Sequence, residues 1–246
     1  MEYKTSEIEV KLEDTVFLVK IVKGKRKTVT LKIISGAELL VKAPSAFSNT
    51  RLKELLEKKK KWILEHASVF TEEKNPFLSI RYIDGSKVYY MGKAYEFHVK
   101  YQEPDGEGKT EADIRKTNER ISVETIDTSE EYVKKQMQTW YKNQARNEII
   151  KMIQKYRPYI GEKIGTIRIK SQKSRWGSCS ELGNLNFNWH LILLPESLME
   201  YVVVHELCHL RYLNHSEDFW NCVKQILPDY KERETELKKY GGLLYN

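Results

Sequence analysis

Several features common in other protein classes are missing from this 246-residue sequence. No apolar run approaches the ~20 residues that a membrane-spanning helix needs, and the polar start at Met1–Lys4 lacks the apolar segment of a secretion signal. Three cysteines without paired spacing exclude a disulfide framework. No glycine-rich phosphate loop is present. We therefore expect a cytoplasmic protein with reduced thiols and no membrane anchor.

The composition is that of a globular protein with a basic surface. Hydrophobic residues make up 40% of the chain and aromatic residues 11%, and the net charge of +7 predicts weak attraction to anions. The densest basic runs are Lys58–Lys61 and Lys25–Lys27. They fit a solvated helix face and a hairpin turn better than a nucleic-acid interface, so nucleic acid is the less favoured partner.

One short stretch, from His205 to His215, holds three of the six histidines. His205 and His209 are four positions apart, so on a helix both imidazoles leave the same face and can bind one metal ion. Glu206 projects beside them, where it can reach a water without ligating the metal. This H-E-x-x-H pattern is typical of zinc hydrolases and predicts a Zn²⁺ cofactor.

A third ligand requires the helix to stop. If the helix continued, His215 would point away from the metal, ~9 Å further along the axis. Tyr212 stands where the long form of the motif has glycine, so we expect a turn near Leu213–Asn214, with Asn214 in the left-handed conformation. His215 then becomes the third ligand. An acid just downstream, Glu217 or Asp218, is the alternative.

The first half of the chain has a mostly β pattern. Alternating apolar residues from Ser6 to Lys42 predict antiparallel hairpins, and Ser48 is placed to cap a helix that runs to about His66. A second strand group follows between Tyr82 and Ile126, interrupted by a polar loop at Gln102–Asn118. Residues 1–127 are therefore predicted to form a β-rich N-terminal region with one helix.

The second half predicts a different arrangement. Thr128 and Glu131 resemble a capping box that opens a long helix, which Arg157-Pro158 ends. The apolar alternation of Leu185–Ile192 predicts a strand, and Pro195 begins the metal helix, which is apolar over most of its circumference and thus buried. The fold class is α+β, with a second domain of residues 128–246.

Several segments together resemble the YgjP-like family of metal-dependent hydrolases, placed among the zincin metallopeptidases. In the second half the resemblance rests on Trp176–Cys179, Asn186–Trp189, Val203–His209, Asn214–Ser216 and Phe219-Trp220, and in the first half on Lys25–Thr28, Ala43-Pro44 and Trp62-Ile63. In ligand spacing the motif is also similar to the WLM and SprT-like proteases. The sequence departs from the family pattern at His190, where an arginine is expected.

The resemblance implies a zincin-like catalytic domain with a long backing helix, a small sheet and the H-E-x-x-H helix. It also implies zinc on His205, His209 and His215, with Glu206 as general base, acting on a peptide or protein substrate through a zinc-activated water. A peptide is expected to lie along the strand Leu185–Ile192, added to an exposed sheet edge. The candidate substrate-binding residues are Arg175, Trp176, Asn186, Asn188 and His190; purely structural roles for the two asparagines are an equal alternative.

Three other functions compete with the peptidase. The same site could hydrolyse a nucleotide phosphoanhydride, although no phosphate loop supports that chemistry. The protein could be nucleic-acid-associated, with the N-terminal hairpins and the lysine-rich helix as its binding surface and a regulated protease site. A purely structural zinc is the weakest alternative, because three protein ligands and Glu206 describe an open site.

Overall fold

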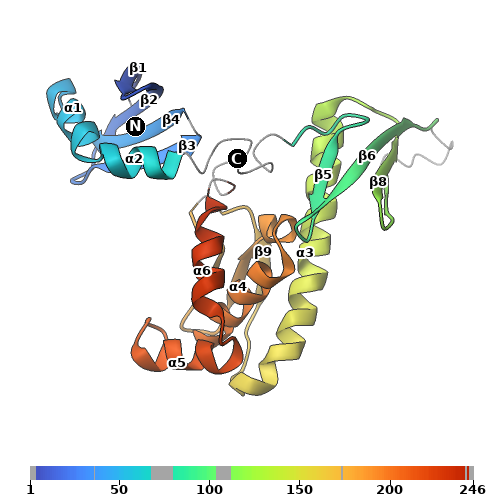
Figure 1. Cartoon of the computed structure of the whole chain (residues 1–246). Helices are drawn as coiled ribbons and strands as arrows, with labels where there is room; N and C mark the ends of the chain where they lie inside the picture. The colour runs from blue at the N-terminus through green and yellow to red at the C-terminus, as the bar shows by residue number, and fades with distance from the viewer. Residues whose placement is uncertain are drawn as a thin grey trace. The chain divides into compact units, whose positions relative to one another are not determined.

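The computed structural model of the chain describes residues 4–35, 37–67, 80–103, 112–172, 174–241 and 243. Its contacts divide the chain into unit 1, residues 1–78 with 245–246, and unit 2, residues 79–244 (Figure 1). The division lies near residue 78 and not at the predicted 127/128, because the second group of strands packs against the helices that follow it. The α+β class is as predicted.

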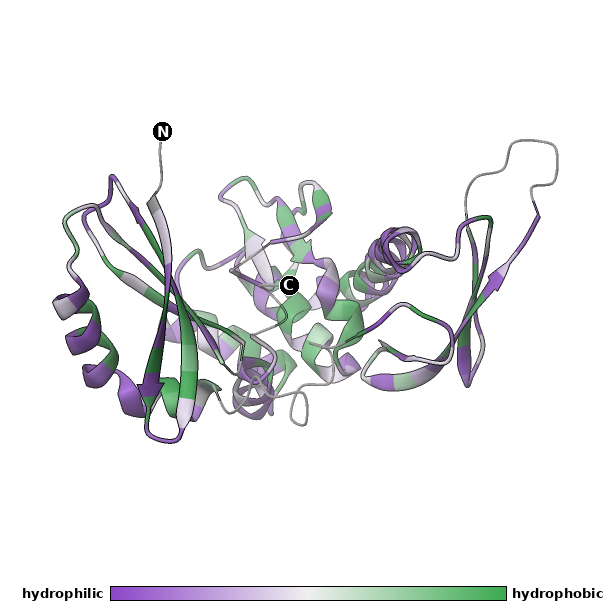
Figure 2. Cartoon of the chain, turned by 90° about the horizontal axis from the view of Figure 1, so that it is seen from above, coloured by the Kyte–Doolittle hydropathy of each residue, from purple (hydrophilic) through white to green (hydrophobic). Residues whose placement is uncertain are grey.

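Unit 1 is one four-stranded sheet covered by two short helices. Alternate residues of its strands are buried, as in Phe17, Val19 and Ile21, and these pack with Leu52 and Leu56 of the first helix. The hydropathy colours of Figure 2 follow this division, with hydrophobic residues toward the interior and hydrophilic residues outside. The elements are β1 (Lys4–Leu12), β2 (Thr15–Gly24), β3 (Thr30–Ser35), β4 (Glu38–Pro44), α1 (Asn49–Lys58) and α2 (Lys60–Ala67).

The helix predicted to run from Ser48 to about His66 is divided into two helices, and Ser48 caps the first of them, as predicted. The Ser48 hydroxyl accepts a hydrogen bond from the Arg51 backbone N–H at 3.2 Å. Lys59 interrupts the helix and separates α1 from α2.

The second sheet, in unit 2, has the topology of the first. The strand orders are β1-β2-β4-β3 and β5-β6-β8-β7, and in each sheet two antiparallel hairpins join through a central parallel pair. The predicted antiparallel hairpins of unit 1 are present as β1–β2 and β3–β4, but β2 and β4 pair in parallel. The second sheet comprises β5 (Lys87–Tyr90), β6 (Lys93–Tyr101), β7 (Asp113–Lys116) and β8 (Arg120–Thr125). Strand β7 lies within the predicted loop, because Ile114 is its one apolar residue and alternation gives no signal there.

The long helix α3 (Glu130–Ile160) forms the backing of unit 2 (Figure 1). Ser129, without a side-chain cap, precedes it instead of the predicted capping box. Pro158 lies inside the helix, which ends at Gly161 in the left-handed conformation. Proline has no N–H to donate to the carbonyl four residues earlier, so the helix passes Pro158 without that backbone hydrogen bond and ends within one turn of it.

A small third sheet and a group of shorter elements complete unit 2. The sheet order is β10-β11-β9, so β11 is its central strand. The predicted strand Leu185–Ile192 divides at Asn188 into β11 and a short 3₁₀ helix, η3. The elements are β9 (Ile167–Lys170), β10 (Gly177–Cys179), β11 (Leu185–Asn188), η3 (Trp189–Leu193), α4 (Glu196–Cys208), α5 (Glu217–Ile226) and α6 (Tyr230–Lys238). Among the described residues, no helix combines the length and apolar character needed to cross a membrane.

The tip of the β5–β6 hairpin fastens the second sheet to the rest of unit 2. Met91 and Gly92 both have positive φ, 51° and 76°, as a tight two-residue hairpin turn requires. Their backbone N–H groups donate to the carbonyls of Ile192 and Leu193 in η3, at 2.7 and 3.1 Å. A Cβ on Gly92 would lie 2.8 Å from Pro195 Cα, so only glycine fits.

Replacing Gly92 by alanine is therefore expected to destabilise the protein through two effects. Gly85 has the same φ of 76° but no atom within 4 Å of a built Cβ, so Gly85→Ala is the matched control. The control should lose about 1–2 kcal/mol from backbone strain, and Gly92→Ala a further 1–3 kcal/mol or so from the steric clash. Urea denaturation measures both, and equal losses would contradict the docking of this turn.

Glu200 on α4 joins three helices through one half-buried carboxylate. Arg233 of α6 donates to it at 2.6 Å and Lys155 of α3 at 2.9 Å, and the Tyr156 hydroxyl also donates. Burial alone would raise the pKa of Glu200, but these hydrogen bonds outweigh it and lower the pKa to about 2. The ionised carboxylate thus holds α4 in place between α3 and α6.

This network predicts a specific acid sensitivity. A carboxyl whose pKa falls from 4.5 to about 2 on folding stabilises the folded state above pH 4.5, and that contribution disappears as the pH falls toward 2. Glu200→Gln should be less stable than the wild type at pH 7 and converge with it near pH 2, measured by urea denaturation across this range. Glu196→Gln, at an exposed position of the same helix, is the control. Parallel pH profiles for Glu200→Gln and the wild type would contradict this role.

Candidate metal centre and active site

Two imidazoles and one carboxylate of the candidate site come from helix α4, whose side chains are mostly buried. Nearly all of its side chains from Leu198 to Cys208 are buried, so the helix cannot shift without disturbing the core. His205 and His209 leave one face of it, with ring centroids 4.8 Å apart. The Cys208 thiol lies 3.0 Å from that of Cys222 on α5, and it is not part of the histidine cluster.

The chain then turns back to bring in His215. Helix α4 ends at Cys208, a turn follows, and the backbone bends at Leu213–Asn214, near the predicted position. Asn214 is not left-handed, contrary to expectation: among the described residues, Glu13 and Met91 are the non-glycine residues with positive φ. The turn that precedes the bend is closed by the backbone N–H groups of Leu210 and Arg211, which donate to the carbonyls of Leu207 and Cys208.

Three imidazole nitrogens converge on one point. The Nε2 atom of His215 lies 3.1 Å from that of His205 and 3.2 Å from that of His209. Nitrogens around a tetrahedral zinc, each ~2.0–2.1 Å from the ion, would be roughly 3.3 Å apart. The three residues thus form a cluster suited to a metal. Glu217 and Asp218, the alternative ligands, lie outside it in the first turn of α5.

The hydrogen bonds leave the correct ring nitrogen free. His209 Nδ1 lies 2.8 Å from the Tyr212 carbonyl oxygen, which can only accept, so Nδ1 carries the proton and Nε2 presents its lone pair. The turn after α4 therefore orients a ligand as well as returning the chain.

Two aromatic residues of α5 hold the imidazoles in place. The Phe219 ring stacks on His209 at 4.4 Å and meets the edges of His205 and His215, each at 4.9 Å. Trp220 stacks on His215 at 5.5 Å. The Ser216 hydroxyl caps α5 by accepting a hydrogen bond from the Phe219 N–H. This cap fixes the first turn of α5, which carries Phe219 and Trp220.

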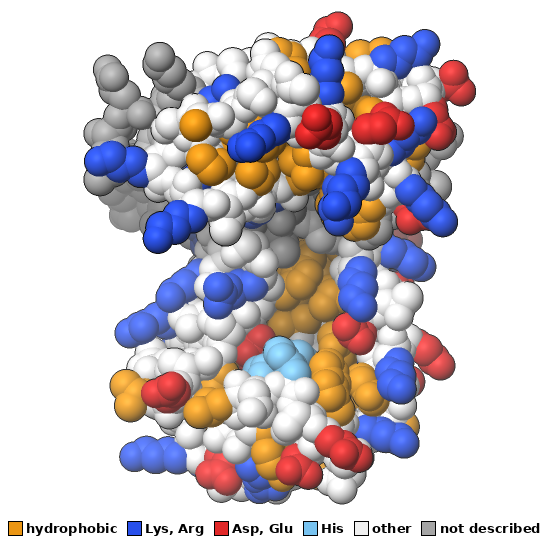
Figure 3. All heavy atoms as spheres, turned by 90° about the vertical axis from the view of Figure 1, so that its left-hand side faces the viewer, with side chains coloured by type: hydrophobic (Ala, Val, Ile, Leu, Met, Phe, Trp, Pro, Cys, Tyr) orange, Lys and Arg blue, Asp and Glu red, His pale blue; other side chains and the backbone are white. Residues whose placement is uncertain are grey.

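Burial shifts the pKa values of His205 and Glu206 toward their uncharged forms. It lowers the pKa of His205 to about 3, with smaller contributions from His209 and His215. It raises the pKa of Glu206 to about 8, and the Arg175 guanidinium opposes this shift. In Figure 3 the imidazoles reach the surface of unit 2 at one spot, beside hydrophobic side chains. The cluster therefore combines an apolar setting with an open side.

Glu206 lies directly over strand β10. A Cβ built on Gly177 would be 2.6 Å from Glu206 Oε1, so the carboxylate occupies space that only glycine leaves free. Its Oε2 is buried and has no hydrogen-bond partner among the described residues. Leaving such an atom unpaired costs on the order of 1–3 kcal/mol, which is consistent with a group reserved for water or substrate.

Two of the predicted substrate-binding residues make structural hydrogen bonds. The Asn188 amide donates to the carbonyls of Gln172 and Arg175 at 2.7 and 3.3 Å. Its Oδ1 must then accept, so His190 Nδ1, at 2.9 Å, carries a proton. Both residues are buried, and His190 stacks on Trp189 at 3.9 Å. They hold the loop before β10 against η3.

Of the other three predicted residues, Trp176 and Arg175 lie beside the site. Trp176 lines a pocket of about 430 Å³ with His205 and Glu206. Arg175 is exposed and influences the Glu206 carboxylate. The Asn186 amide donates to the Ser178 hydroxyl at 3.2 Å, and its Oδ1 is buried without a partner among the described residues.

Several site residues were not predicted from the sequence. Tyr201 and Leu237 also line the pocket, Gly177 makes room for the carboxylate, and Tyr212 orients a ligand through its carbonyl. Tyr201 lies four residues before His205 on one helix face, so helical spacing could have indicated it. Leu237 and Gly177 depend on contacts between distant segments, and Tyr212 acts through a backbone carbonyl whose direction the turn after α4 sets.

Three converging imidazoles beside a buried glutamate form the arrangement that metal-dependent hydrolases use. The sequence model of the YgjP-like metallopeptidase domain matches residues 27–240 of the 246-residue chain. The chain therefore belongs to the YgjP-like metallopeptidase family, which implies a bound metal. Comparisons with curated proteins and with solved structures gave no match.

The Gly177–Glu206 contact can be tested directly. In Gly177→Ala the added methyl group must displace the carboxyl end of Glu206, a flexible group, so folding should survive while hydrolysis falls. A displacement of ~1 Å at a reacting group costs about 100-fold in rate. Zinc content and thermal stability, measured beside hydrolysis of labelled casein by zinc-loaded protein, should stay close to wild type. Unchanged activity would show that Glu206 does not depend on this space.

Proposed function

We propose that the protein is a zinc-dependent peptidase in which His205, His209 and His215 hold the metal and Glu206 is the general base. The observation that carries the proposal is the convergence of three Nε2 atoms beside a buried carboxylate oxygen that has no partner among the described residues. Membership of a metallopeptidase family supports peptide or protein substrates. A zincin-like arrangement of α4 against α3 and β10 is consistent with this reading.

Each residue has a distinct role in this reaction. When bound, zinc supplies a Lewis acid that polarises a carbonyl and makes water more acidic. Glu206 accepts a proton from the attacking water and delivers it to the leaving nitrogen. The His209–Tyr212 hydrogen bond and the ring contacts of Phe219 keep the imidazoles oriented throughout.

The substrate strand differs from the one expected from sequence. Strand β11 has neighbours on both sides, so it offers no free edge for a peptide. Strand β10 is an edge of this sheet and packs against α4. A peptide that paired with Gly177–Cys179 would run past Glu206, with backbone hydrogen bonds supplying affinity. We therefore assign substrate alignment to β10.

The pocket beside Glu206 favours an apolar substrate side chain. Its walls include Trp176, Tyr201, Val202 and Leu237, and charged groups, among them Lys238, lie at α6. An apolar wall supplies no ligands for a phosphate chain, so this pocket gives the phosphoanhydride alternative no support. A peptide with a hydrophobic residue next to the cleaved bond fits it best.

Glu206→Gln separates metal binding from catalysis. Because Glu206 is not a ligand, the variant should keep about one zinc per chain by elemental analysis and lose about 10²–10⁴-fold in casein hydrolysis. His215→Ala should lose both zinc and activity. Wild-type protein without zinc after purification and zinc loading would refute the metal site. Full hydrolysis by zinc-loaded Glu206→Gln would refute the assigned base.

A further inference from the structure

The positive charge of this protein is concentrated in one segment. Residues 134–176 contain twelve of the 42 lysines and arginines but two of the 35 acidic residues, a net charge of +10. The remaining 30 basic and 33 acidic residues leave the rest of the chain at −3. The basic character of the protein therefore belongs to α3, β9 and the loop before β10.

Five of these cations, here called the basic band, come from three segments of unit 2 that are joined by hydrogen bonds: Lys142, Arg146, Arg168, Lys170 and Arg175. Lys142 and Arg146 are one turn apart on α3, and Arg146 donates to the Ile167 carbonyl of β9 at 3.4 Å. Arg168 and Lys170 follow on one face of β9, where they alternate with half-buried isoleucines. Asn188, the strand partner of Lys170, donates to the Arg175 carbonyl.

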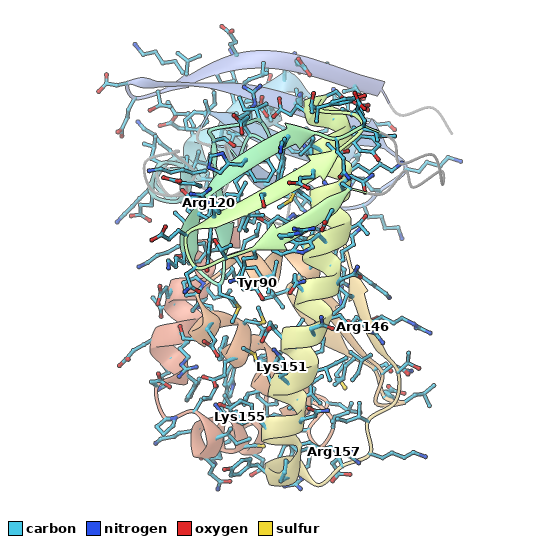
Figure 4. All side chains as sticks on the ribbon, turned by 90° about the vertical axis from the view of Figure 1, so that its right-hand side faces the viewer. Tyr90, Arg120, Arg146, Lys151, Lys155 and Arg157 are labelled. Carbon is cyan, nitrogen blue, oxygen red and sulfur yellow. The ribbon has the colours of Figure 1, made fainter. Side chains whose placement is uncertain are left out.

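These cations are exposed and not neutralised. Lys142 is half-buried and the other four are exposed, and none of the five has an ion pair among the described residues. Other lysines of α3 behave differently, since Lys151 pairs with Glu148 and Lys155 with Glu200, each at 2.9 Å. Figure 4 shows Arg146 and Arg157 along one edge of α3 and Lys155 along the other. Arg175 acts on the Glu206 carboxylate without a salt bridge, and the other four cations of the band have no acidic partner among the described residues.

The lysine-rich run of unit 1 is the weaker candidate for the same role. Lys60 lies 3.5 Å from Glu13 and 3.8 Å from Glu57, and Lys61 lies 3.9 Å from Glu65. Local acids therefore offset part of this charge, as on an ordinary solvated helix.

We propose that the basic band binds the phosphodiester backbone of a nucleic acid. Duplex DNA carries about one negative charge per 1.7 Å of axis, and lysine and arginine on a rigid surface are the groups that neutralise it. Four of the five cations lie on a helix and a sheet edge, so their charges are held at fixed spacing, and Arg175 lies in the loop before β10. This binding goes beyond the proposed peptidase activity and requires neither zinc nor Glu206.

Salt-dependent binding tests the proposal. The probes are a fluorescent 30-base-pair duplex, the same single strand and the matching RNA, measured by anisotropy from about 50 to 200 mM salt. Five phosphate contacts predict a slope of log K against log salt of about −4 to −5 on duplex DNA. The three probes decide which nucleic acid is preferred. Glu206→Gln should bind like the wild type, which separates this result from the peptidase proposal.

The triple variant Arg146→Gln, Arg168→Gln, Lys170→Gln should reduce the slope by about 2.7, because each lost contact contributes about 0.9. The matched control, Lys53→Gln, Lys58→Gln, Lys59→Gln on exposed positions of unit 1, should leave it unchanged. If the triple variant does not fold by thermal melting, the double variant Arg168→Gln, Lys170→Gln should reduce the slope by about 1.8.

Three results would overturn the proposal. The first is a wild-type protein that binds none of the probes at 50 mM salt. The second is a loss of slope in the unit 1 control and not in the band variant. The third is equal displacement of the duplex by a polyglutamate peptide of the same charge, which would identify the band as a site for acidic proteins.

Discussion

The active site depends on one constraint: three imidazoles must meet at a point that a single helix cannot provide. An α-helix brings His205 and His209 together but directs every later residue elsewhere. The chain solves this by ending α4 at Cys208 and returning His215 through a bend, after which Phe219 packs against all three rings. The position of α5 is therefore as important to the site as the H-E-x-x-H motif itself.

A second constraint acts from the sheet side of the site. Strand β10 must come close enough to α4 to face Glu206, and Gly177 allows that approach by having no side chain. The same strand is an edge of its sheet, so in the proposed peptidase one short segment would both make room for Glu206 and offer a pairing surface for a peptide. Asn188 and His190 hold the preceding loop in place, which explains two buried polar residues beside the site.

Two further features of unit 2 hold α4 in position and take no part in the proposed chemistry. The β5–β6 turn is hydrogen-bonded to η3, which leads into α4, and Glu200 fixes α4 between α3 and α6. Helix α3 thus supports the site from behind, while its outer edge contributes to the basic band beside β9. A rigid backing element can serve both purposes because its buried and exposed faces are separate.

The sequence by itself determined the chemistry and the local elements: the H-E-x-x-H spacing, the return to His215, the Ser48 and Ser216 caps, and the buried character of α4. These follow from residues within a few positions of one another, where helical geometry and capping apply directly. Tertiary structure alone decided the parallel β2–β4 and β6–β8 pairs, the central place of β11, and the fit of Glu206 over Gly177. Such features depend on which distant segments pack together. The alternation of apolar residues in a strand does not reveal its pairing partner, because the pattern is the same for every partner.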